Sequence, residues 1–305
     1  MDISVILSTF RRPHLLQATL ESFCALSCQS LQWELIVVDN GDDTESREVA
    51  LRHTARLPIR LITENKRGKN NALNTAIEKA RGKLFIFTDD DVLPKQDWLI
   101  QMWQGASRWP THSVFGGRIL PAYPPGRRPQ FDHPFFIGAF AIANWEIPEG
   151  EYEAHRVWGP NMAIRAELFK DGWRFNPEIG PDGTANYVSG SETELTNRLE
   201  AAGFKAVYLP LSLVYHQIRE DQLTDRYFFR RAFRLGQQIA FKDYGPRQQL
   251  LFGIPRTIWL RFFRTWKRRW CSGFTLDERN RFDRKIEYWQ TLGAINWYRS
   301  HRSSE

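Results

Sequence analysis

Short apolar runs alternate with amphipathic segments through the first third of the chain, and this alternation limits the possible folds more than any other feature. The apolar runs predict buried strands at 3–7, 34–38, 59–62, 84–87 and 113–115. The segments between them predict helices from Pro13 and near 44–56, 69–81 and 96–108. Strands that alternate with helices form a parallel sheet with helices on its faces. The sequence therefore predicts an α/β fold with a mostly parallel sheet.

The rest of the chain divides into stretches of different character. Residues 121–190 are rich in Pro, Gly and aromatic residues, and long irregular segments in a compact protein are usually binding loops or lids. Two short strands are expected near 205–209 and 212–215, and the chain is expected to be mostly helical from about residue 221. We therefore predict three segments, at 1–118, 119–220 and 221–305.

Three aspartates, Asp89, Asp90 and Asp91, directly follow the fourth apolar run. In open α/β sheets, ligands bind at the carboxyl ends of the strands, so this position predicts a site. Asp89 and Asp91 lie two residues apart and would point the same way on an extended chain. Oxygen ligands of this kind suit Mg²⁺ or Mn²⁺ bound to a phosphate-bearing substrate. The alternative is an Asp-rich turn that caps a helix.

Two further segments are expected at this edge of the sheet. Asp39 closes the second strand, where it either forms a turn or holds a nucleoside base or ribose. Residues 66–74 open a helix with basic side chains, and a helix N-terminus beside basic groups favours anions. The segment lacks the Gly and the Ser/Thr of a Walker P-loop. It predicts an anion site of another kind, with a basic capped turn as the alternative.

Seven segments, taken in their order and spacing, resemble family 2 glycosyltransferases with the GT-A fold, a Rossmann-like, mostly parallel sheet flanked by helices. The segments are 8–12, 37–41, 68–74, 80–91, 158–165, 175–183 and 190–199. The resemblance covers about residues 3–240. It implies that 1–118 is the nucleotide-sugar-binding half of one domain and that 119–220 is its acceptor-binding and catalytic-base half. Residues 221–305 would be a basic, aromatic-rich helical extension.

The resemblance assigns the donor and its metal to particular residues. Asp91 would bind the metal directly, and Asp89 and Asp90 would hold the ribose or the metal and its waters. His216 would be a further ligand of metal or phosphate, unless it is structural. The other donor-binding residues would be Thr9, Phe10, Arg11 and Asp39 around the base, and Arg67, Lys69 and Asn70 where the third helix opens.

A general base is needed, because the nucleophile of such a transfer is a neutral hydroxyl. The family places a carboxylate for this task at the start of a helix, usually the Asp of a Glu-Asp pair. Here the pair reads Ser191-Glu192, so Glu192 would be the base and Ser191 a helix N-cap. Glu194 lies two residues further on and would face another side of the helix. The resemblance also implies inversion at the anomeric carbon by single displacement.

The charge of the chain is divided unequally. Residues 226–305 carry 18 basic and 6 acidic side chains, a net charge of +12, whereas residues 1–225 carry −5. Within the basic part, residues 256–270 predict an amphipathic helix. Its apolar face would be Trp259, Phe262, Phe263, Trp266 and Trp270, and its basic face Arg261, Arg264 and Arg268. The stretch 255–270 would either lie on an anionic membrane surface or pack its aromatic side chains on the body of the protein.

These observations predict an enzyme that transfers a sugar from a nucleoside-diphosphate sugar to a hydroxyl with Mn²⁺ or Mg²⁺. UDP is the default nucleotide because it is the commonest in the family, and the acceptor would be a glycan or a lipid-linked molecule in cell-surface glycan synthesis. The alternatives are a nucleotidyltransferase and a nucleic-acid-binding protein that acts through its basic tail, although no nucleic acid partner is expected because the aspartates repel phosphate. The longest nearly apolar stretch, 135–143, is shorter than the ~20 residues of a spanning helix. We therefore expect a cytoplasmic protein, either soluble or peripheral to the membrane.

Overall fold

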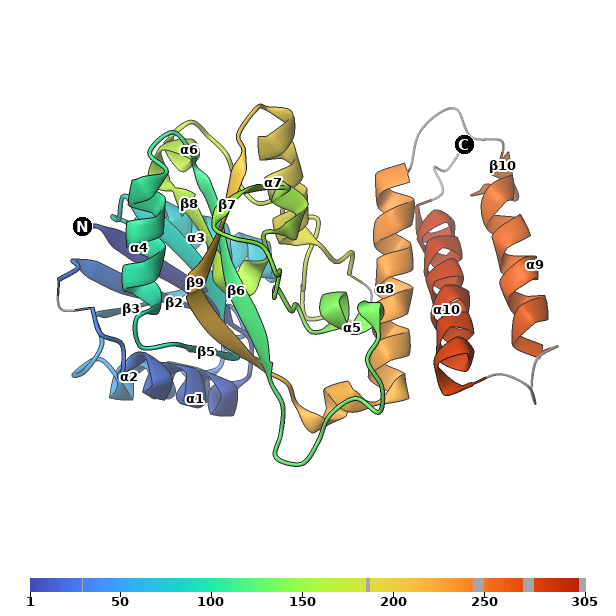
Figure 1. The fold of residues 1–305 in the computed structure, drawn as a ribbon, viewed down its shortest axis with the longest axis horizontal. Coiled ribbons are helices and arrows are strands. Elements are labelled where there is room, and N and C mark those ends of the chain that lie inside the picture. Colours follow the sequence, from blue (N-terminus) through green and yellow to red (C-terminus); the bar gives the residue numbers. More distant parts are fainter. Residues whose placement is uncertain (29, 185–186, 244–249, 271–276, 302–305) are drawn as a thin grey trace. The chain divides into compact units, whose positions relative to one another are not determined.

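The computed structural model describes residues 1–28, 30–184, 187–243, 250–270 and 277–301, which form two compact units (Figure 1). The first, the sheet unit, consists of residues 1–123, 136–183 and 191–218. The second, the helical unit, consists of residues 124–135, 184–190 and 219–305. The sheet unit contains residues of both predicted halves of the domain, and the functional division between those halves stays a prediction.

In the described residues, the sheet unit is built on a nine-stranded sheet with the order β3-β2-β1-β4-β8-β6-β9-β5, and β7 pairs with β9. The strands are β1 (Ile3–Thr9), β2 (Trp33–Asp39), β3 (Ile59–Thr63), β4 (Leu84–Asp89), β5 (Val92–Pro94), β6 (Val114–Ala122), β7 (Gly150–Tyr152), β8 (Met162–Arg165) and β9 (Ala206–Gln217). β3, β2, β1 and β4 are parallel, and β8 pairs antiparallel with β4. The predicted α/β fold is confirmed: β1 to β4, which the alternation predicted, are parallel, and β6 pairs parallel with β9 as well.

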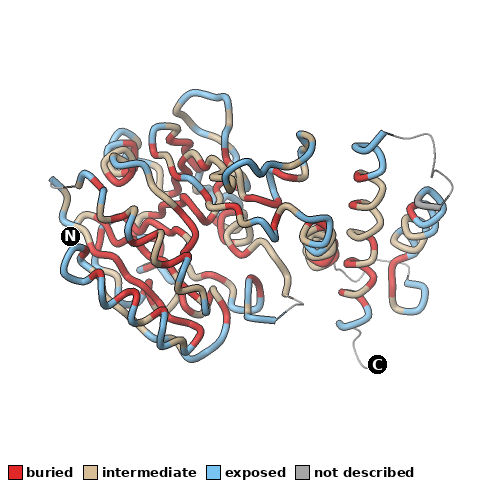
Figure 2. The backbone as a smooth tube through the Cα atoms, turned by 90° about the horizontal axis from the view of Figure 1, so that it is seen from below, coloured by how far each residue is buried: buried red, intermediate tan, exposed pale blue. Residues whose placement is uncertain are grey.

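Helices cover both faces of the sheet, because successive residues of a strand point to opposite sides. Ile3, Val5 and Leu7 of β1 pack with α1, α2 and α4, whereas Ile6 packs on the other face with α3, α6 and α7. These helices are α1 (Pro13–Phe23), α2 (Thr44–Arg52), α3 (Lys69–Lys79), α4 (Trp98–Arg108), α6 (Ala166–Lys170) and α7 (Ser191–Ala201). β1, β2 and β4 between them are almost entirely buried (Figure 2). The two apolar layers hold the strand ends, and the side chains that follow them, in a fixed register.

β9 is one long strand, where the sequence predicted two short ones near 205–209 and 212–215. The interruption is a bulge, because the register of β9 with β6 shifts around Pro210, which has no N–H for a ladder bond. The buried Asn161 donates from Nδ2 to the carbonyl oxygen of Ser212 at 2.8 Å and so satisfies a backbone group at the bulge. The strand then continues to the edge of the sheet that carries the aspartates.

The described residues of the helical unit contain three long helices, α8 (Asp225–Asp243), α9 (Arg256–Trp270) and α10 (Glu278–Ser300). α8 and α10 approach closely at Gly236 and Gly293, because a Cβ at either position would lie within 2 Å of a backbone oxygen of the other helix. A hairpin of β10 (Leu250–Leu251) and β11 (Ile254–Pro255) precedes α9. The sequence predicted the helices but not this hairpin.

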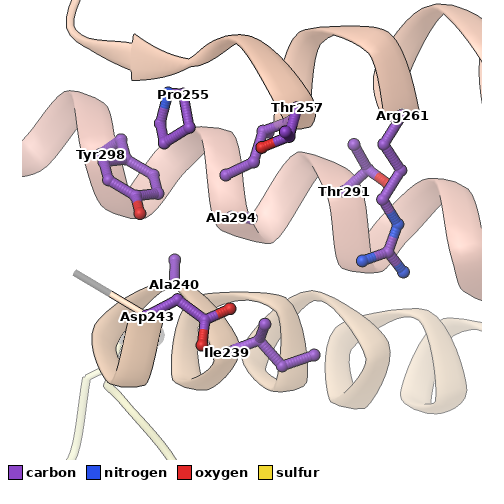
Figure 3. A pocket seen from close by; sticks show the side chains of 10 residues that line it. Ile239, Ala240, Asp243, Pro255, Thr257, Arg261, Thr291, Ala294 and Tyr298 are labelled. Atoms are coloured by element: carbon purple, nitrogen blue, oxygen red, sulfur yellow. The ribbon is translucent and has the colours of Figure 1, made fainter. Parts of the chain in front are cut away.

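α9 packs on α10 along one side only. Ile258 and Phe262 lie against the apolar cluster that α10 contributes, and Thr265 is buried. A pocket of about 220 Å³ remains between α8, α9 and α10, with Thr257 and Tyr298 among its lining side chains (Figure 3). Across the described part of both units, we find no helix with the length and apolar character needed to cross a membrane.

Candidate functional site

The carboxyl ends of β1, β2 and β4 lie side by side at one edge of the sheet. In the register of these strands, Thr9 is opposite Asp39 and Ser8 is opposite Asp89. The end of β9 belongs to the same edge, because β5, which follows the aspartates, pairs with it. The strand order therefore brings together polar side chains that are far apart in the sequence.

The aspartates after β4 have different partners. Asp89 ends the strand, and its Oδ1 accepts a hydrogen bond from Lys69 Nζ at 2.7 Å. Asp90 is buried, and its Oδ2 accepts a hydrogen bond from Thr9 Oγ1 at 2.7 Å. Residues 90 and 91 form a turn, so the chain from Asp89 to Asp91 is not extended as the prediction assumed. Thr9 orients Asp90, and its contact with a nucleoside base stays a prediction.

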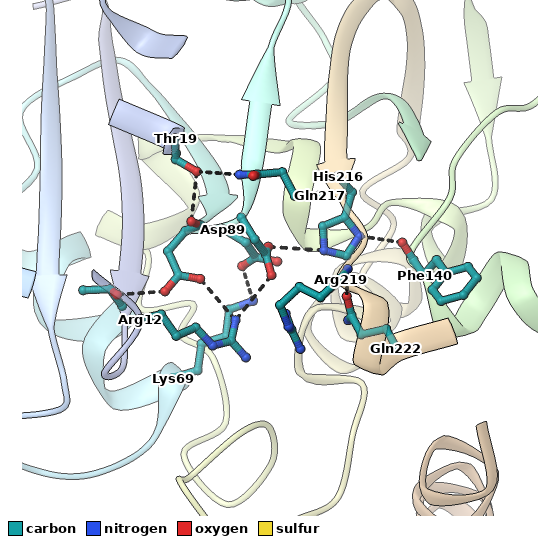
Figure 4. A network of polar contacts seen from close by, with 12 residues as sticks. Arg12, Thr19, Lys69, Asp89, Phe140, His216, Gln217, Arg219 and Gln222 are labelled. Carbon is teal, nitrogen blue, oxygen red and sulfur yellow. Dashed lines mark hydrogen bonds and ion pairs between the residues drawn. The ribbon is translucent and has the colours of Figure 1, made fainter. Parts of the chain in front are cut away.

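Asp91 lies against His216 at the end of β9. Its Oδ1 is 3.2 Å from His216 Nε2, while His216 Nδ1 donates to the carbonyl oxygen of Phe140 at 2.6 Å (Figure 4). Because Nδ1 carries a hydrogen, the neutral ring has a lone pair on Nε2, and this lone pair faces the carboxylate. Burial alone would lower the pKa of His216, but the charge of Asp91 outweighs it and the pKa is raised. The geometry thus favours a positive charge between the two side chains or on the ring.

Arg12 faces the aspartates, although it is not among the residues predicted to bind the donor. Its guanidinium lies 3.3 Å from both Asp90 Oδ1 and Asp91 Oδ2. Arg11, the predicted residue, has a φ of 53° and lies 5.6 Å from the ring of Phe10. The left-handed backbone at Arg11 sends the two adjacent arginines to different partners, and the sequence offers no signal for which one faces the carboxylates.

The carboxylates at this edge are crowded. Burial raises the pKa of Asp90 most, the neighbouring Asp91 raises it further, and together they bring it to about 6. Arg12 and Thr9 act in the opposite direction but do not cancel the effect. Asp90 is therefore harder to ionise than an exposed aspartate, and a cation bound beside it would favour its charged form.

Glu192 is joined to the aspartates through Lys69. Lys69 Nζ donates to Glu192 Oε1 at 2.7 Å, the same distance as its bond to Asp89. The Ser191 hydroxyl donates to Glu192 Oε2 at 2.9 Å, so Ser191 supports this carboxylate and is not the predicted N-cap. A Cβ at Gly159 would lie 2.4 Å from Glu192 Oε1. Burial alone would raise the pKa of Glu192, but the charge and hydrogen bond of Lys69 lower it overall.

Glu194 belongs to a different network. Its two oxygens accept from Arg198 Nε at 2.6 Å and from the terminal Arg198 nitrogen at 3.0 Å. The same arginine donates to the carbonyl oxygen of Arg174 at 2.7 Å. Glu194 and Glu192 therefore have separate partners, and of the two it is Glu192 that contacts the lysine shared with Asp89.

Asp39 is fully buried and holds its own turn. Its Oδ1 accepts from the backbone N–H of Gly41 at 2.9 Å, and its Oδ2 lies 3.0 Å from a guanidinium nitrogen of Arg47. These contacts correspond to the turn-forming alternative for Asp39. They position the loop at the end of β2, so any contact with a nucleoside would be made beside a carboxylate that already has partners.

Asn70 and Arg67 lie apart from the carboxylates, although both were expected at the donor. Asn70 is buried, and its Nδ2 donates to the carbonyl oxygens of Asn176 at 2.7 Å and Ile179 at 2.9 Å. It therefore fastens the 176–179 loop to α3. Arg67 is exposed in the turn before that helix. Of the three residues predicted at the opening of α3, Lys69 is the one that contacts the carboxylates.

The site fits a hard divalent cation through part of the predicted ligand set. In the described residues, no group of three or more His, Cys, Asp or Glu side chains converges on one point as a complete cage would require. Asp91 and His216 are nevertheless adjacent, and Mg²⁺-like ions commonly take one or two carboxylates and complete their shell with substrate phosphates and water. Asp89 is engaged with Lys69 instead. The donor set fits an ion held jointly by the protein and a diphosphate.

Comparison with known families agrees with this geometry. The family model described as "Glycosyl transferase family 2" matches residues 4–173, more than half of the chain. The chain belongs to glycosyl transferase family 2. A curated relative, "Glycosyltransferase AglE" of Haloferax volcanii, is 25% identical over 209 residues, which are 68% of this chain and 64% of the relative. Another, "Uncharacterized protein y4gI" of Sinorhizobium fredii, is 26% identical over 75% of this chain and 26% of the relative. The match thus spans less than two thirds of either relative's length.

Two solved structures illustrate the similarity of the fold. A mannosyltransferase from Pyrobaculum calidifontis, in complex with GDP-Man and Mn²⁺, superposes with a TM-score of 0.63 at 17% identity over 98% of this chain and 88% of that one. S. aureus TarS 1-349 in complex with UDP-GlcNAc gives a TM-score of 0.56 at 15% identity over 98% and 90%. These likenesses support the GT-A-like fold of this family 2 chain.

Proposed function

We propose that this family 2 chain transfers a sugar from a nucleoside-diphosphate sugar to a hydroxyl, with inversion at the anomeric carbon. The observation that carries the proposal is the position of Lys69, which lies 2.7 Å from both Asp89 and Glu192. A single ammonium group thereby links the edge expected to bind the donor with the carboxylate expected to act as base. Donor binding and removal of the acceptor proton would then be carried out by neighbouring side chains.

Glu192 is suited to accept a proton at the acceptor. Its lowered pKa keeps it ionised at neutral pH, and Lys69 and Ser191 fix its two oxygens. The acceptor oxygen attacks the anomeric carbon while its proton passes to Glu192. The bond between that carbon and the diphosphate oxygen breaks, and its electron pair leaves with the nucleoside diphosphate. One displacement of this kind inverts the anomeric carbon.

The excess of carboxylates at the sheet edge has a role in the same reaction. Asp91 and His216 would hold a divalent cation, Mn²⁺ or Mg²⁺, which when bound neutralises the negative charge that develops on the leaving diphosphate. Arg12 orients Asp90 and Asp91, with 3.3 Å to each carboxylate. The ammonium group of Lys69 lies between Asp89 and Glu192 and so reduces the repulsion between their negative charges. From the same position it can donate a hydrogen bond to a diphosphate oxygen.

The donor and acceptor are proposed only as classes. GDP-Man is bound by one similar structure and UDP-GlcNAc by another, which supports a nucleotide-sugar donor and leaves UDP as a default. The acceptor would carry a hydroxyl on a glycan or a lipid-linked molecule, as in cell-surface glycan synthesis. Membership of family 2 favours sugar transfer over nucleotidyl transfer and over a nucleic-acid-binding role.

The test compares the turnover of two variants, Glu192→Gln and Glu194→Gln. A thermal-shift panel of nucleotide sugars, with and without Mn²⁺, identifies the donor, and release of nucleoside diphosphate then measures turnover. Glu192→Gln should bind the donor normally and lose about 10²–10⁴-fold in turnover, because general-base catalysis contributes that much. Glu194→Gln is the matched control on the same helix and should keep most of its turnover. Unchanged turnover in Glu192→Gln would remove this residue from the base role.

A further inference from the structure

Large apolar side chains are exposed together in one short stretch of the helical unit. Phe252 is 75% exposed and Leu260 is 65% exposed. We call the full set the apolar tip; its members are Leu250, Leu251, Phe252, Leu260, Phe263 and Trp266. They come from the β10–β11 hairpin and from the adjoining α9. The exposed large apolar residues of the sheet unit, in contrast, are scattered along the sequence from Met1 to Tyr215.

The hairpin and α9 form a single surface. Trp259 Nε1 donates to the carbonyl oxygen of Leu251 at 2.9 Å, which fastens the hairpin to the helix. The ring of Trp259 stacks on Phe263, with 6.2 Å between the ring centroids. Because Trp259 contacts both elements, the exposed side chains on either side of it belong to the same face of the unit.

Phe252, at the tip of the hairpin, is an unfavourable residue for the turn that it forms. Phe252 and Gly253 form the turn, with φ values of 53° and 72°. Two-residue turns with positive φ prefer Asn, Asp or Gly, and a bulky aromatic residue is strained there. An exposed phenylalanine in that position costs stability without burying its ring. A role outside the folding of the chain accounts for it better.

The side chains of α9 are divided between its packed and exposed sides differently from the prediction. Phe262 packs toward α10, and Arg261, expected on the basic face in water, donates to Gln290 of α10 at 3.1 Å. Phe263 and Trp266, expected beside Phe262, are exposed instead. The side chain of Trp270 lies outside the described residues. The helix therefore packs within its own unit and still presents an apolar stripe, so packing and surface contact do not exclude each other.

Charge identifies the partner of this surface. Residues 250–270 contain six basic and no acidic side chains, and Arg256, Arg264 and Lys267 are exposed. Basic residues beside exposed aromatic and leucine side chains fit the interface of a bilayer that contains anionic lipids. A second copy of the chain would bring like charges together, and a nucleic acid would leave the leucines in water. We propose that the apolar tip inserts into the head-group region of an anionic membrane.

Vesicle binding tests the proposal on the full chain. Sedimentation with vesicles of phosphatidylglycerol and phosphatidylcholine in equal parts should carry the protein down, and phosphatidylcholine alone should carry far less. Phe252→Ser and Trp266→Ser should each weaken partitioning about tenfold, because each removes the burial of one aromatic ring. Leu211→Ser is the matched control, since Leu211 is 60% exposed in the sheet unit and should have no effect.

Charge variants complete the test. Lys267→Glu should weaken binding about fivefold or more, since each basic residue near an anionic surface contributes about that factor. Lys170→Glu, an exposed lysine of α6, should leave binding unchanged. Circular dichroism confirms that all variants are folded. Vesicle binding that survives Phe252→Ser and Trp266→Ser together overturns the proposal. A dimer in solution that the same changes dissociate, without vesicle binding, overturns it in favour of a second copy.

Discussion

Buried carboxylates lie at both ends of β2 and its neighbours, and the pKa values of two of them, Glu34 and Asp90, move in opposite directions. At the amino end, Glu34 accepts hydrogen bonds from Ser4 Oγ at 2.7 Å, the backbone N–H of Arg81 at 2.8 Å and Arg60 at 2.6 Å. Burial alone would raise the pKa of Glu34, but these donors lower it. At the carboxyl end, the pKa of Asp90 rises to about 6. The ionised carboxylate is therefore favoured at Glu34 and disfavoured at Asp90.

Burial raises the pKa at both positions, and the groups around each carboxylate decide whether that rise is reversed. Glu34 has one guanidinium and two neutral donors to itself. At the other edge, the carboxylates of Asp89, Asp90, Asp91 and Glu192 lie among the side chains of Lys69, Arg12 and His216. A buried excess of negative charge costs stability unless a cation is bound, and such perturbed groups concentrate at functional sites. The network around Glu34 is thus the one expected of a structural role, and the crowded edge is where the proposed function places the donor and its metal.

Removing Lys69 should have the largest effect, because it takes one positive charge away from the carboxylates at the carboxyl ends of the strands. Lys69→Met leaves Asp89 and Glu192 without their shared ammonium, so Glu192 loses the donor that fixes its Oε1 and, as its pKa rises, a smaller fraction of it is ionised. We expect turnover to fall about a hundredfold. We also expect Mn²⁺ alone to raise Tm by more in this variant than in the unchanged chain, since the carboxylates attract cations more strongly.

Lys79→Met provides the matched control for this change. Lys79 is exposed at the end of the same helix, α3, away from the carboxylates. Turnover and the Mn²⁺ shift should both stay as they are in the unchanged chain. If Lys69→Met behaved like Lys79→Met, the charge argument would be wrong, because the two carboxylates would not depend on the lysine between them.

Gly159→Ala sharpens the comparison by moving a carboxylate without changing any charge. The new Cβ would lie 2.4 Å from Glu192 Oε1 and 2.8 Å from its Cδ, so the carboxylate must shift. Since the end of a flexible side chain moves at little cost, the free energy of unfolding should change by less than about 1 kcal/mol. Turnover should fall about tenfold to a hundredfold, because misplacement of a catalytic group by a fraction of an ångström is costly.

The control for steric insertion is Gly150→Ala. Gly150 opens β7, and a Cβ there meets no atom within 4 Å. Both stability and turnover should be retained. Equal turnover in the Gly159 and Gly150 variants would show that the position of Glu192 beside Gly159 has no part in the reaction.

The sequence was sufficient to predict which strands end at the site. Apolar runs and their alternation with helices place Asp39 and Asp89 at adjacent strand ends, and the structure has them there. Helical spacing also separated Glu192 from Glu194, whose different partners agree with it. These predictions worked because they depend on the period of a strand or helix, which is a local property.

Other features depend on contacts that local patterns do not contain. The left-handed backbone of Arg11 makes Arg12 the partner of the aspartates, and no residue type at either position signals this. The faces of α9 were wrong because α10, which begins only after it, decides which side chains are covered. The hairpin before α9 was missed because its strands are two residues each. In each case a distant segment determines what a side chain touches.

Glu34→Gln should have the smallest effect on turnover and tests the network around Glu34. At pH 7 the change removes one ionic partner of Arg60 and weakens the bonds to Ser4 and Arg81, so unfolding should become easier by about 1–3 kcal/mol. Because the pKa of Glu34 in the folded chain lies below its unfolded value, its contribution is complete above about pH 4.3 and is lost as the pH falls through the folded pKa. Urea unfolding at pH 7 and near pH 3.5 should therefore show a difference that shrinks in acid, while turnover per folded molecule stays constant. A difference that grew in acid would mean that Glu34, like Asp90, is strained as an anion, and the contrast between the two edges would disappear.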